Sequence, residues 1–315
     1  LPAPNDAFGF KMMAVDQDPI AVLLNTPEAA VLVVVVSTQG ASYNPVGAMM
    51  AVWSDGTRVG SLSLGCLEED IVHHARRALE TNAVVPLHYG DGSPYFDIQL
   101  PCGGGLQLAL VPRPDKCVLR ALCERRARRE ACSFDIDLQA GAVALGAQSM
   151  TCLIDTTLHV HFAPKLRFLI FGTGPAVDVF AGLAQAGGFS SMLFSPNESD
   201  VAQSLTAGRH AQVLTTKAFP AAASVDAQTA IILLFHDHDW EFDILTHAVR
   251  SPAVYIGAQG SRRAQEMRLM ALEQRGVEKQ ARDRIHGPMG LIPSTRDPVF
   301  LSVSVLAEIL AETQS

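Results

Sequence analysis

Apolar residues in the first half of the chain form short runs separated by polar turns. The run of β-branched residues from Val31 to Val36 predicts a strand that is buried on both faces. The pair Asp55-Gly56 lies between two apolar segments and predicts a hairpin turn. The remaining patterns predict strands at 48–53, 58–63, 84–89 and 106–111, and a helix at 68–80. We therefore expect a mixed α/β domain.

Further along, a helical pattern at 115–129 precedes two or three short strands within 134–162. Ala163-Pro164-Lys165 is typical of a linker. Strand and helix patterns then alternate, with strands at 166–171, 191–194, 212–214, 229–235 and 253–256 and a terminal helix at 298–312. Such alternation predicts a doubly wound parallel sheet. The expected domains are 1–163 and 164–315.

Composition narrows the class of protein. The net charge of −8 argues against a nucleic-acid binder, because neutralising phosphates requires clustered Lys and Arg. The longest apolar run, from Ala29 to Val36, is too short to span a bilayer. Six cysteines without a CxxC pair argue against a structural zinc site and favour a reducing, cytoplasmic compartment. A homodimer is expected from the general frequency of dimers.

Two cysteines lie beside glycines. Cys102 stands before Gly103, Gly104 and Gly105, where a ligand can approach the backbone closely. Cys66 precedes the predicted helix at 68–80, and a helix N-terminus lowers the pKa of a thiol. For both thiols the alternative is simple packing. The other four lack such surroundings and are expected to be inert: Cys117, Cys123, Cys132 and Cys152.

The second domain opens with a strand that runs into Gly172-Thr173-Gly174 and then a helix, the arrangement that a dinucleotide fold uses to bind phosphate. Val177 replaces the third glycine of the usual fingerprint, however. Ser195-Pro196 occupies the place where an acid would bind the ribose. These two departures argue against ordinary NAD binding.

Two more turns carry candidate chemistry. His236-Asp237-His238-Asp239 follows the fourth strand, and alternation along an extended chain would place the two histidines on one side. A metal site, ligand contacts, and helix capping by Asp239 all remain open there. Gly260-Ser261-Arg262-Arg263, with Ser261 as a candidate N-cap, predicts an anion site at a helix start. Surface arginines are the alternative. His286 lies in a further turn at the level of the ligand crevice.

Taken together, these motifs resemble the XdhC/CoxI family, the accessory proteins that mature xanthine dehydrogenases and related molybdenum hydroxylases. The resemblance rests on motifs spread over nearly the whole chain: Pro45-Val46-Gly47-Ala48-Met49-Met50, Gly65-Cys66-Leu67-Glu68, Cys102-Gly103-Gly104, Gly172-Thr173-Gly174, His236-Asp237-His238-Asp239, Tyr255-Ile256-Gly257, Gly260-Ser261-Arg262-Arg263, Ile285-His286, Pro288-Met289-Gly290-Leu291 and Val303-Ser304-Val305-Leu306-Ala307-Glu308.

The resemblance implies an XdhC/CoxI-type N-terminal domain, a Rossmann-like C-terminal domain, and a non-catalytic chaperone. Such a protein binds the molybdenum cofactor, as molybdopterin or a nucleotide form. It protects the cofactor during sulfuration and delivers it to an apo molybdenum hydroxylase, with a cysteine desulfurase as a further candidate partner. Cys66 and Cys102 would contact the molybdenum. The expected cofactor-binding residues are these two with Gly103, Gly104, Gly172, Gly174, His236, Asp237, His238, Gly260, Ser261, Arg262, Arg263 and His286.

Two alternatives belong to other classes. An NAD(P)-linked oxidoreductase would use the second domain, but the sequence shows neither a ribose-binding acid nor a clear proton-transfer pair. A metal hydrolase would use His236 and His238, but the G-x-S-x-G and H-E-x-x-H motifs are absent.

Overall fold

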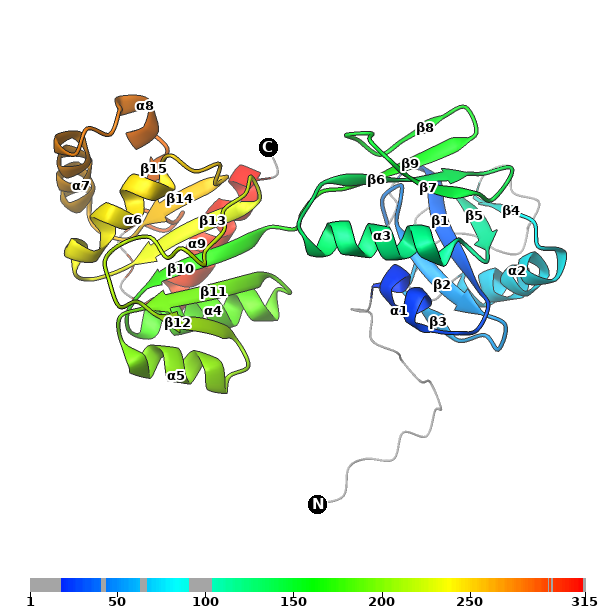
Figure 1. Cartoon of the computed structure of the whole chain (residues 1–315), viewed down its shortest axis with the longest axis horizontal. Helices are drawn as coiled ribbons and strands as arrows, with labels where there is room; N and C mark the ends of the chain where they lie inside the picture. The colour runs from blue at the N-terminus through cyan, green and yellow to red at the C-terminus, as the bar shows by residue number, and fades with distance from the viewer. Residues whose placement is uncertain are drawn as a thin grey trace, which may run out of the picture. The chain divides into compact units, whose positions relative to one another are not determined.

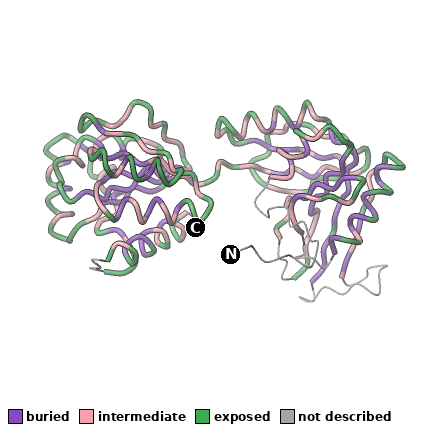
Figure 2. The backbone as a smooth tube through the Cα atoms, turned by 90° about the horizontal axis from the view of Figure 1, so that it is seen from below, coloured by how far each residue is buried: buried purple, intermediate pink, exposed green. Residues whose placement is uncertain are grey.

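A computed structural model describes residues 18–40, 44–62, 67–90, 104–293, 295 and 297–313. The chain divides into two compact units, Leu1–Pro164 and Lys165–Ser315. Buried backbone (purple in Figure 2) is concentrated in the central strands of each unit. Within the described residues, none of the helices has the length and apolar character needed to cross a bilayer.

Unit 1 contains three helices and nine strands within its described residues (Figure 1). In chain order they are α1 (Pro19–Asn25), β1 (Ala30–Gln39), β2 (Met49–Trp53), β3 (Arg58–Val59), α2 (Glu68–Thr81), β4 (Val85–Tyr89), β5 (Gly105–Pro112), α3 (Lys116–Ala127), β6 (Cys132–Asp137), β7 (Val143–Gly146), β8 (Cys152–Ile154) and β9 (Thr157–Phe162).

The first sheet of unit 1 has the order β3-β2-β1-β5-β4, and its neighbouring strands are antiparallel. Strand β1 is central and buried on both faces, as the β-branched run predicts. Leu32 and Val34 contribute to one core, while Val31, Val33 and Val35 contribute to another, which packs against α2. Side chains that alternate across a strand supply both cores at once.

A second, four-stranded antiparallel sheet with the order β7-β6-β9-β8 completes unit 1. The sequence predicted only two or three strands here. The underestimate has a physical cause, since β8 and β9 are separated by a two-residue connection in which Asp155 has φ 51°. Asparagine and aspartate tolerate this left-handed conformation, so the chain reverses without the glycine that marks a turn in sequence.

Unit 2 is built around one six-stranded sheet whose paired strands are all parallel, in the order β12-β11-β10-β13-β14-β15. The elements in chain order are β10 (Arg167–Gly172), α4 (Pro175–Ala186), β11 (Ser190–Ser195), α5 (Glu198–Thr206), β12 (His210–Val213), β13 (Thr229–Leu234), η1 (His238–Trp240), α6 (Glu241–Ala248), β14 (Tyr255–Ala258), α7 (Arg262–Gln274), α8 (Lys279–Arg282), β15 (Ile285–His286) and α9 (Pro298–Thr313).

Helices cover both faces of this sheet (Figure 1). Ile231 and Leu233 of β13 pack on the face covered by α6 and α7, whereas Ile232 packs on the face covered by α4 and α9. The doubly wound arrangement predicted from the sequence is therefore present. The sixth strand, β15, was expected to be only a turn, because two residues are too few to produce a periodic signal.

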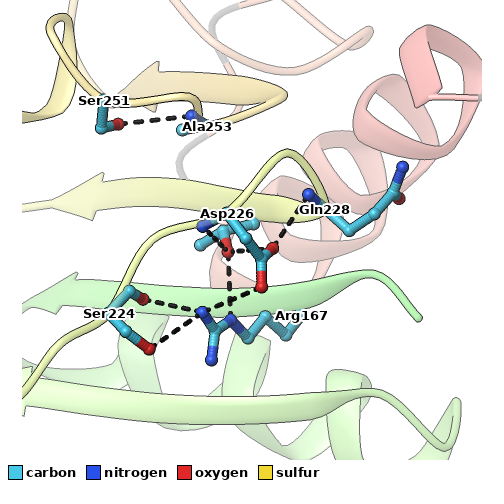
Figure 3. A network of polar contacts seen from close by, with 7 residues as sticks. Arg167, Ser224, Asp226, Gln228, Ser251 and Ala253 are labelled. Carbon is cyan, nitrogen blue, oxygen red and sulfur yellow. Dashed lines mark hydrogen bonds and ion pairs between the residues drawn. The ribbon is translucent and has the colours of Figure 1, made fainter. Parts of the chain in front are cut away.

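At the amino-terminal ends of the parallel strands, the amino edge of the sheet, side chains hydrogen-bond to neighbouring segments (Figure 3). Arg167 donates to Thr229 Oγ1 at 3.0 Å and to the Ser224 carbonyl at 2.8 Å, and it pairs with Asp226 at 3.2 Å. Arg284 donates to three carbonyl groups of the α6–β14 connection, at 2.6, 2.9 and 2.6 Å. Both guanidinium groups thus hold connecting segments against the sheet.

Candidate functional site

Three of the motifs form turns at the carboxyl edge of the unit 2 sheet. They follow β10, β13 and β14, which are neighbours in the order β10-β13-β14. The carboxyl ends of parallel strands are where ligands bind in folds of this kind. The sheet therefore assembles motifs that are far apart in sequence along one edge.

The turn after β10 owes its shape to close backbone packing. A side chain on Gly172 would place its Cβ 2.6 Å from the carbonyl oxygen of Leu234, so only glycine fits there. Gly174 has φ 79° and open space where a Cβ would be. Its N–H, however, is not available to a ligand, because it donates to Asp200 Oδ2 at 2.9 Å.

The segment after β13 is bent and then forms the short helix η1, so it is not the extended chain that the sequence suggested. The alternation argument that placed both histidines on one side therefore does not apply. Asp237 caps η1 by accepting from Asp239 N at 3.0 Å, whereas Asp239 lies 3.6 Å from Lys217 and does not act as the cap. His236, Asp237 and His238 are all exposed.

His238 is oriented by a buried network. Its Nδ1 lies 3.2 Å from Glu241 Oε2, and the Glu241 side chain is fully buried. Arg268, 2% exposed, donates to both oxygens of that carboxylate, at 2.8 and 3.3 Å. A histidine that donates Nδ1–H to a carboxylate keeps Nε2 as an acceptor or ligand atom. The network can therefore present the imidazole in one orientation.

Arg268 also joins the turns after β13 and β14. It donates to the Gln259 carbonyl at 2.8 Å and to Gln265 Oε1 at 2.5 Å. A Cβ on Gly260 would lie 3.7 Å from His238 Cε1, so this glycine lies directly beside the imidazole. The structure thus brings together two motifs that the sequence could place only on separate strands.

The turn after β14 leads into α7, whose start has the predicted character. Ser261 caps the helix by accepting from Ala264 N at 3.2 Å. Arg262 and Arg263 are exposed, and neither forms an ion pair with the part of the chain that the structure describes. Two available guanidinium groups at a helix N-terminus favour an anionic ligand, because the helix dipole adds to their charge.

His286 is held by its neighbours. Its ring stacks on Tyr255 with centroids 4.4 Å apart, and its Nδ1 lies 3.5 Å from Glu308 Oε1. The Tyr255 hydroxyl donates to Glu308 Oε1 at 2.8 Å, and burial raises the pKa of that phenol. Glu308 also accepts from Gly290 N. The motifs Tyr-Ile-Gly and Pro-Met-Gly therefore contribute to packing between β14, β15 and α9.

Unit 1 contains a second region of interest, at the sheet end where β1 and β4 finish and β5 begins. A Cβ on Gly90 would lie 2.6 Å from the Gly104 carbonyl oxygen, and one on Gly40 would lie 3.6 Å from the Gly104 Cα. The start of α2 reaches the same end, because Tyr89 donates to Asp70 Oδ2 at 2.6 Å. The first turn of α2 and the start of β5 therefore both lie at this end of the sheet.

Glu68 fixes the chain just before α2. This carboxylate is 2% exposed and accepts from Ser61 Oγ at 2.7 Å, Leu62 N at 3.3 Å and Leu67 N at 3.2 Å. In the sequence, Glu68 stood out only as a member of the Gly65-Cys66-Leu67-Glu68 motif. Three of the predicted site residues lie outside the described residues: Cys66, Cys102 and Gly103.

Four cysteines were expected to be inert, and the surroundings of two of them support this prediction. Burial raises the pKa of Cys123 and Cys132 and so disfavours the reactive thiolate. Among the described residues, there is no group of three or more His, Cys, Asp or Glu side chains that could hold a metal ion. His236 and His238 therefore do not form a metal centre with described neighbours.

Sequence reasoning missed Asp200, Glu241 and Arg268, and a partial signal existed for one of them. Glu241 stands three residues after His238, the spacing at which helical side chains meet. Arg268 resembled any surface arginine of a charged helix. Asp200 is 26 residues from its partner Gly174, and no local pattern links the two.

The fold defines an α/β protein of two compact units whose C-terminal unit is Rossmann-like. Comparison with known proteins then gives the family. Residues 168–309 match the XdhC Rossmann domain, and residues 23–90 match the XdhC and CoxI family. The chain is also 34% identical to the molybdenum cofactor insertion chaperone PaoD of Escherichia coli, over 91% of this chain and 84% of that protein. It belongs to the XdhC/CoxI family.

Two other comparisons cover similar lengths. A protein of Bacillus subtilis named as a probable xanthine dehydrogenase component is 24% identical over 91% of this chain and 94% of that protein. A crystal structure described as a xanthine dehydrogenase from Bacillus halodurans superimposes with a TM-score of 0.73 and 20% identity, covering 94% of each chain. The second match confirms the fold.

Proposed function

We propose that this protein binds the molybdenum cofactor and inserts it into an apo molybdenum hydroxylase. The observation that carries the proposal is the 34% identity to a molybdenum cofactor insertion chaperone over 91% of the chain. The fold contributes a ligand-binding edge, and the exposed turns along it can hold a polar, anionic molecule. The protein acts as a carrier, so it needs affinity and release and no reaction of its own.

The phosphate of the cofactor, or of its nucleotide form, binds at the start of α7. Arg262 and Arg263 are exposed there at the helix N-terminus, and such a site suits a phosphate group. His238 faces the same turn through Gly260 and offers Nε2 to a donor group of the ligand. The donor set therefore fits an anionic ligand that also carries N–H and O–H groups.

Cys66 and Cys102 contact the molybdenum or its sulfur ligands, because thiolates suit a soft, sulfur-rich metal centre. The support from described residues is that Gly104, two residues after Cys102, and the first turn of α2, which follows Cys66, both contact the Tyr89–Gly90 end of the first sheet. We further propose that the bound cofactor is protected while a terminal sulfido ligand is installed, with a cysteine desulfurase as the sulfur donor, and that the carrier is a homodimer.

Anaerobic co-expression with cofactor synthesis tests binding directly. Purified protein should contain molybdenum and pterin in stoichiometric amounts, and adding it to an apo molybdenum hydroxylase should restore activity. Absence of both molybdenum and pterin under these conditions would contradict the proposal. If the protein binds the cofactor but never transfers it, the protein would be a storage protein and the proposed insertion function would be wrong.

Matched variants separate the two binding regions. Cys102→Ala and Cys66→Ala should reduce molybdenum content, whereas Cys117→Ala, which removes an exposed thiol on α3, should not. Arg263→Ala should weaken binding of the phosphate-bearing ligand, whereas Arg250→Ala removes an exposed arginine near the amino edge and should leave binding unchanged. If each variant and its control changed binding equally, the assigned residues would not be the binding residues.

A further inference from the structure

Three successive residues of the glycine turn after β10, Thr173, Gly174 and Pro175, offer no free N–H to a phosphate group. In a Rossmann fold, free N–H groups of this turn and of the following helix bind the pyrophosphate of a dinucleotide. Here Thr173 N donates to the Leu234 carbonyl at 3.5 Å, and Gly174 N donates to Asp200 Oδ2 at 2.9 Å. Pro175, the first residue of α4, has no N–H.

The Asp200 carboxylate is held at this turn by its own surroundings. Ser195, fully buried at the end of β11, donates its hydroxyl to the same Oδ2 at 3.1 Å. Asn197 begins α5 by accepting from Ser199 N, which places Asp200 in the first turn of that helix. The carboxylate is therefore positioned by the strand end and the helix start, without any ligand.

The start of α4 has a second carboxylate nearby, but that one is paired with an arginine. Asp178 lies in the first turn of that helix and pairs with Arg209, so its charge is compensated. Asp200, in contrast, is in contact with a backbone N–H and a hydroxyl, neither of which carries a charge. An incoming pyrophosphate would meet this uncompensated carboxylate at the site where it needs hydrogen-bond donors.

We infer that Asp200 is a specificity-determining residue: it occupies the position at the Rossmann turn where the pyrophosphate of NAD would bind, and so it excludes NAD from this turn. Steric closure is not the cause, because open space surrounds the position where a Cβ of Gly174 would lie. The exclusion is electrostatic and comes from the loss of donors. This inference rests on the hydrogen bonds of the turn and is independent of the proposed carrier function.

Calorimetric titration with NAD and with inorganic pyrophosphate provides the test. Wild-type protein should bind NAD weakly, and it should bind pyrophosphate at the start of α7 but only weakly at the glycine turn. Asp200→Ala frees the Gly174 N–H and removes the charge, so affinity for pyrophosphate should rise by about tenfold or more. Asp200→Asn removes the charge but keeps an acceptor oxygen, so it should give a smaller rise. Asp200→Ser provides a second small side chain should the alanine variant fail to fold.

Two controls isolate the turn. Glu198→Gln removes one negative charge from the same first turn of α5, on an exposed side chain, and should give no rise. Repeating the titrations with Arg262→Ala and Arg263→Ala present removes the other anion site, and the gain at Asp200 should persist.

Three results would overturn the inference. Tight NAD binding by the wild-type protein that is lost in Asp200→Asn would make Asp200 a ribose-binding acid instead. Unchanged weak binding in every Asp200 variant would show that the carboxylate excludes nothing. An equal rise in Glu198→Gln would reduce the effect to overall charge.

Discussion

The two edges of the unit 2 sheet use arginine in opposite ways. At the amino edge, Arg167 donates to carbonyl, hydroxyl and carboxylate groups around the start of β13 (Figure 3). Arg284 donates to carbonyl groups of the α6–β14 connection. At the carboxyl edge, Arg262 and Arg263 are exposed and form no ion pair with described residues. Hydrogen-bonding capacity that is satisfied internally supports stability, whereas capacity left open is available to a ligand.

The carboxyl edge contains both an exposed layer of turns and a buried layer of side chains beneath them. Beneath the exposed turns, Glu241 and Arg268 form a buried ion pair that holds His238 and the Gln259 carbonyl. The exposed layer can change partners, while the buried layer fixes where its residues point. Stability and binding should therefore respond to different substitutions along a single edge.

The largest expected effect on stability comes from the buried layer. Arg268→Ala would leave the fully buried Glu241 carboxylate without its partner, and we expect a loss of about 3–5 kcal/mol in the free energy of unfolding. Urea denaturation followed by circular dichroism measures it. The double variant Arg268→Met with Glu241→Leu should recover much of that loss. If stability does not recover, the loss in Arg268→Ala comes from packing and not from an unpaired buried charge.

The exposed layer should show the opposite behaviour. Arg262→Ala combined with Arg263→Ala should weaken binding of a phosphate-bearing ligand by at least about tenfold, because charge-assisted bonds contribute about 1.5–3 kcal/mol each. The free energy of unfolding should change by less than about 0.5 kcal/mol, as for surface positions generally. A large loss of stability would show that these arginines are structural.

A smaller effect on stability is expected at the amino edge. Arg167→Ala removes the bonds to Thr229 and Ser224 and the contact with Asp226, which should cost about 1–2 kcal/mol. Ligand binding should be unaffected, since the change lies at the other end of the strands. If Arg167→Ala weakened binding as much as Arg263→Ala, the distinction between the edges would be lost.

The smallest expected effect concerns the oriented histidine. His238→Ala should weaken cofactor binding a few-fold, the equivalent of about 1 kcal/mol for one hydrogen bond. His210→Ala, which removes an exposed histidine at the start of β12, should have no effect. Titration of both variants with the same ligand makes the comparison. A stronger effect at His210 would place the ligand elsewhere.

Local patterns predicted the regular elements well. The β-branched run at Val31 predicted a strand buried on both faces, and Ser261 was correctly expected to cap a helix. Predictions failed where the chain is short or irregular, as at β15 and in the segment after His236. A strand of two residues, such as β15, is too short to show periodicity. The bend after β13 depends on tertiary contacts that local sequence does not encode.

The candidate site was predicted only in part. The sequence predicts an anion site at Arg262 and Arg263, and the structure shows that both side chains are exposed. It treats Tyr255 as a motif residue and His286 as a cofactor-binding residue, but their stacking and their contacts with Glu308 show that they also hold β14, β15 and α9 together. A motif shared within a family can therefore reflect packing as much as chemistry.

By itself, the sequence determined the two α/β domains, the strand-turn-helix at Gly172 and the capped helix after Ser261, because each depends on residues that are close along the chain. Only the tertiary structure decided that Asp200 occupies the glycine turn and that Arg268 and Glu241 orient His238. These contacts join side chains from different helices and turns, and their formation depends on how those elements pack against one sheet. No periodicity in the chain records that packing.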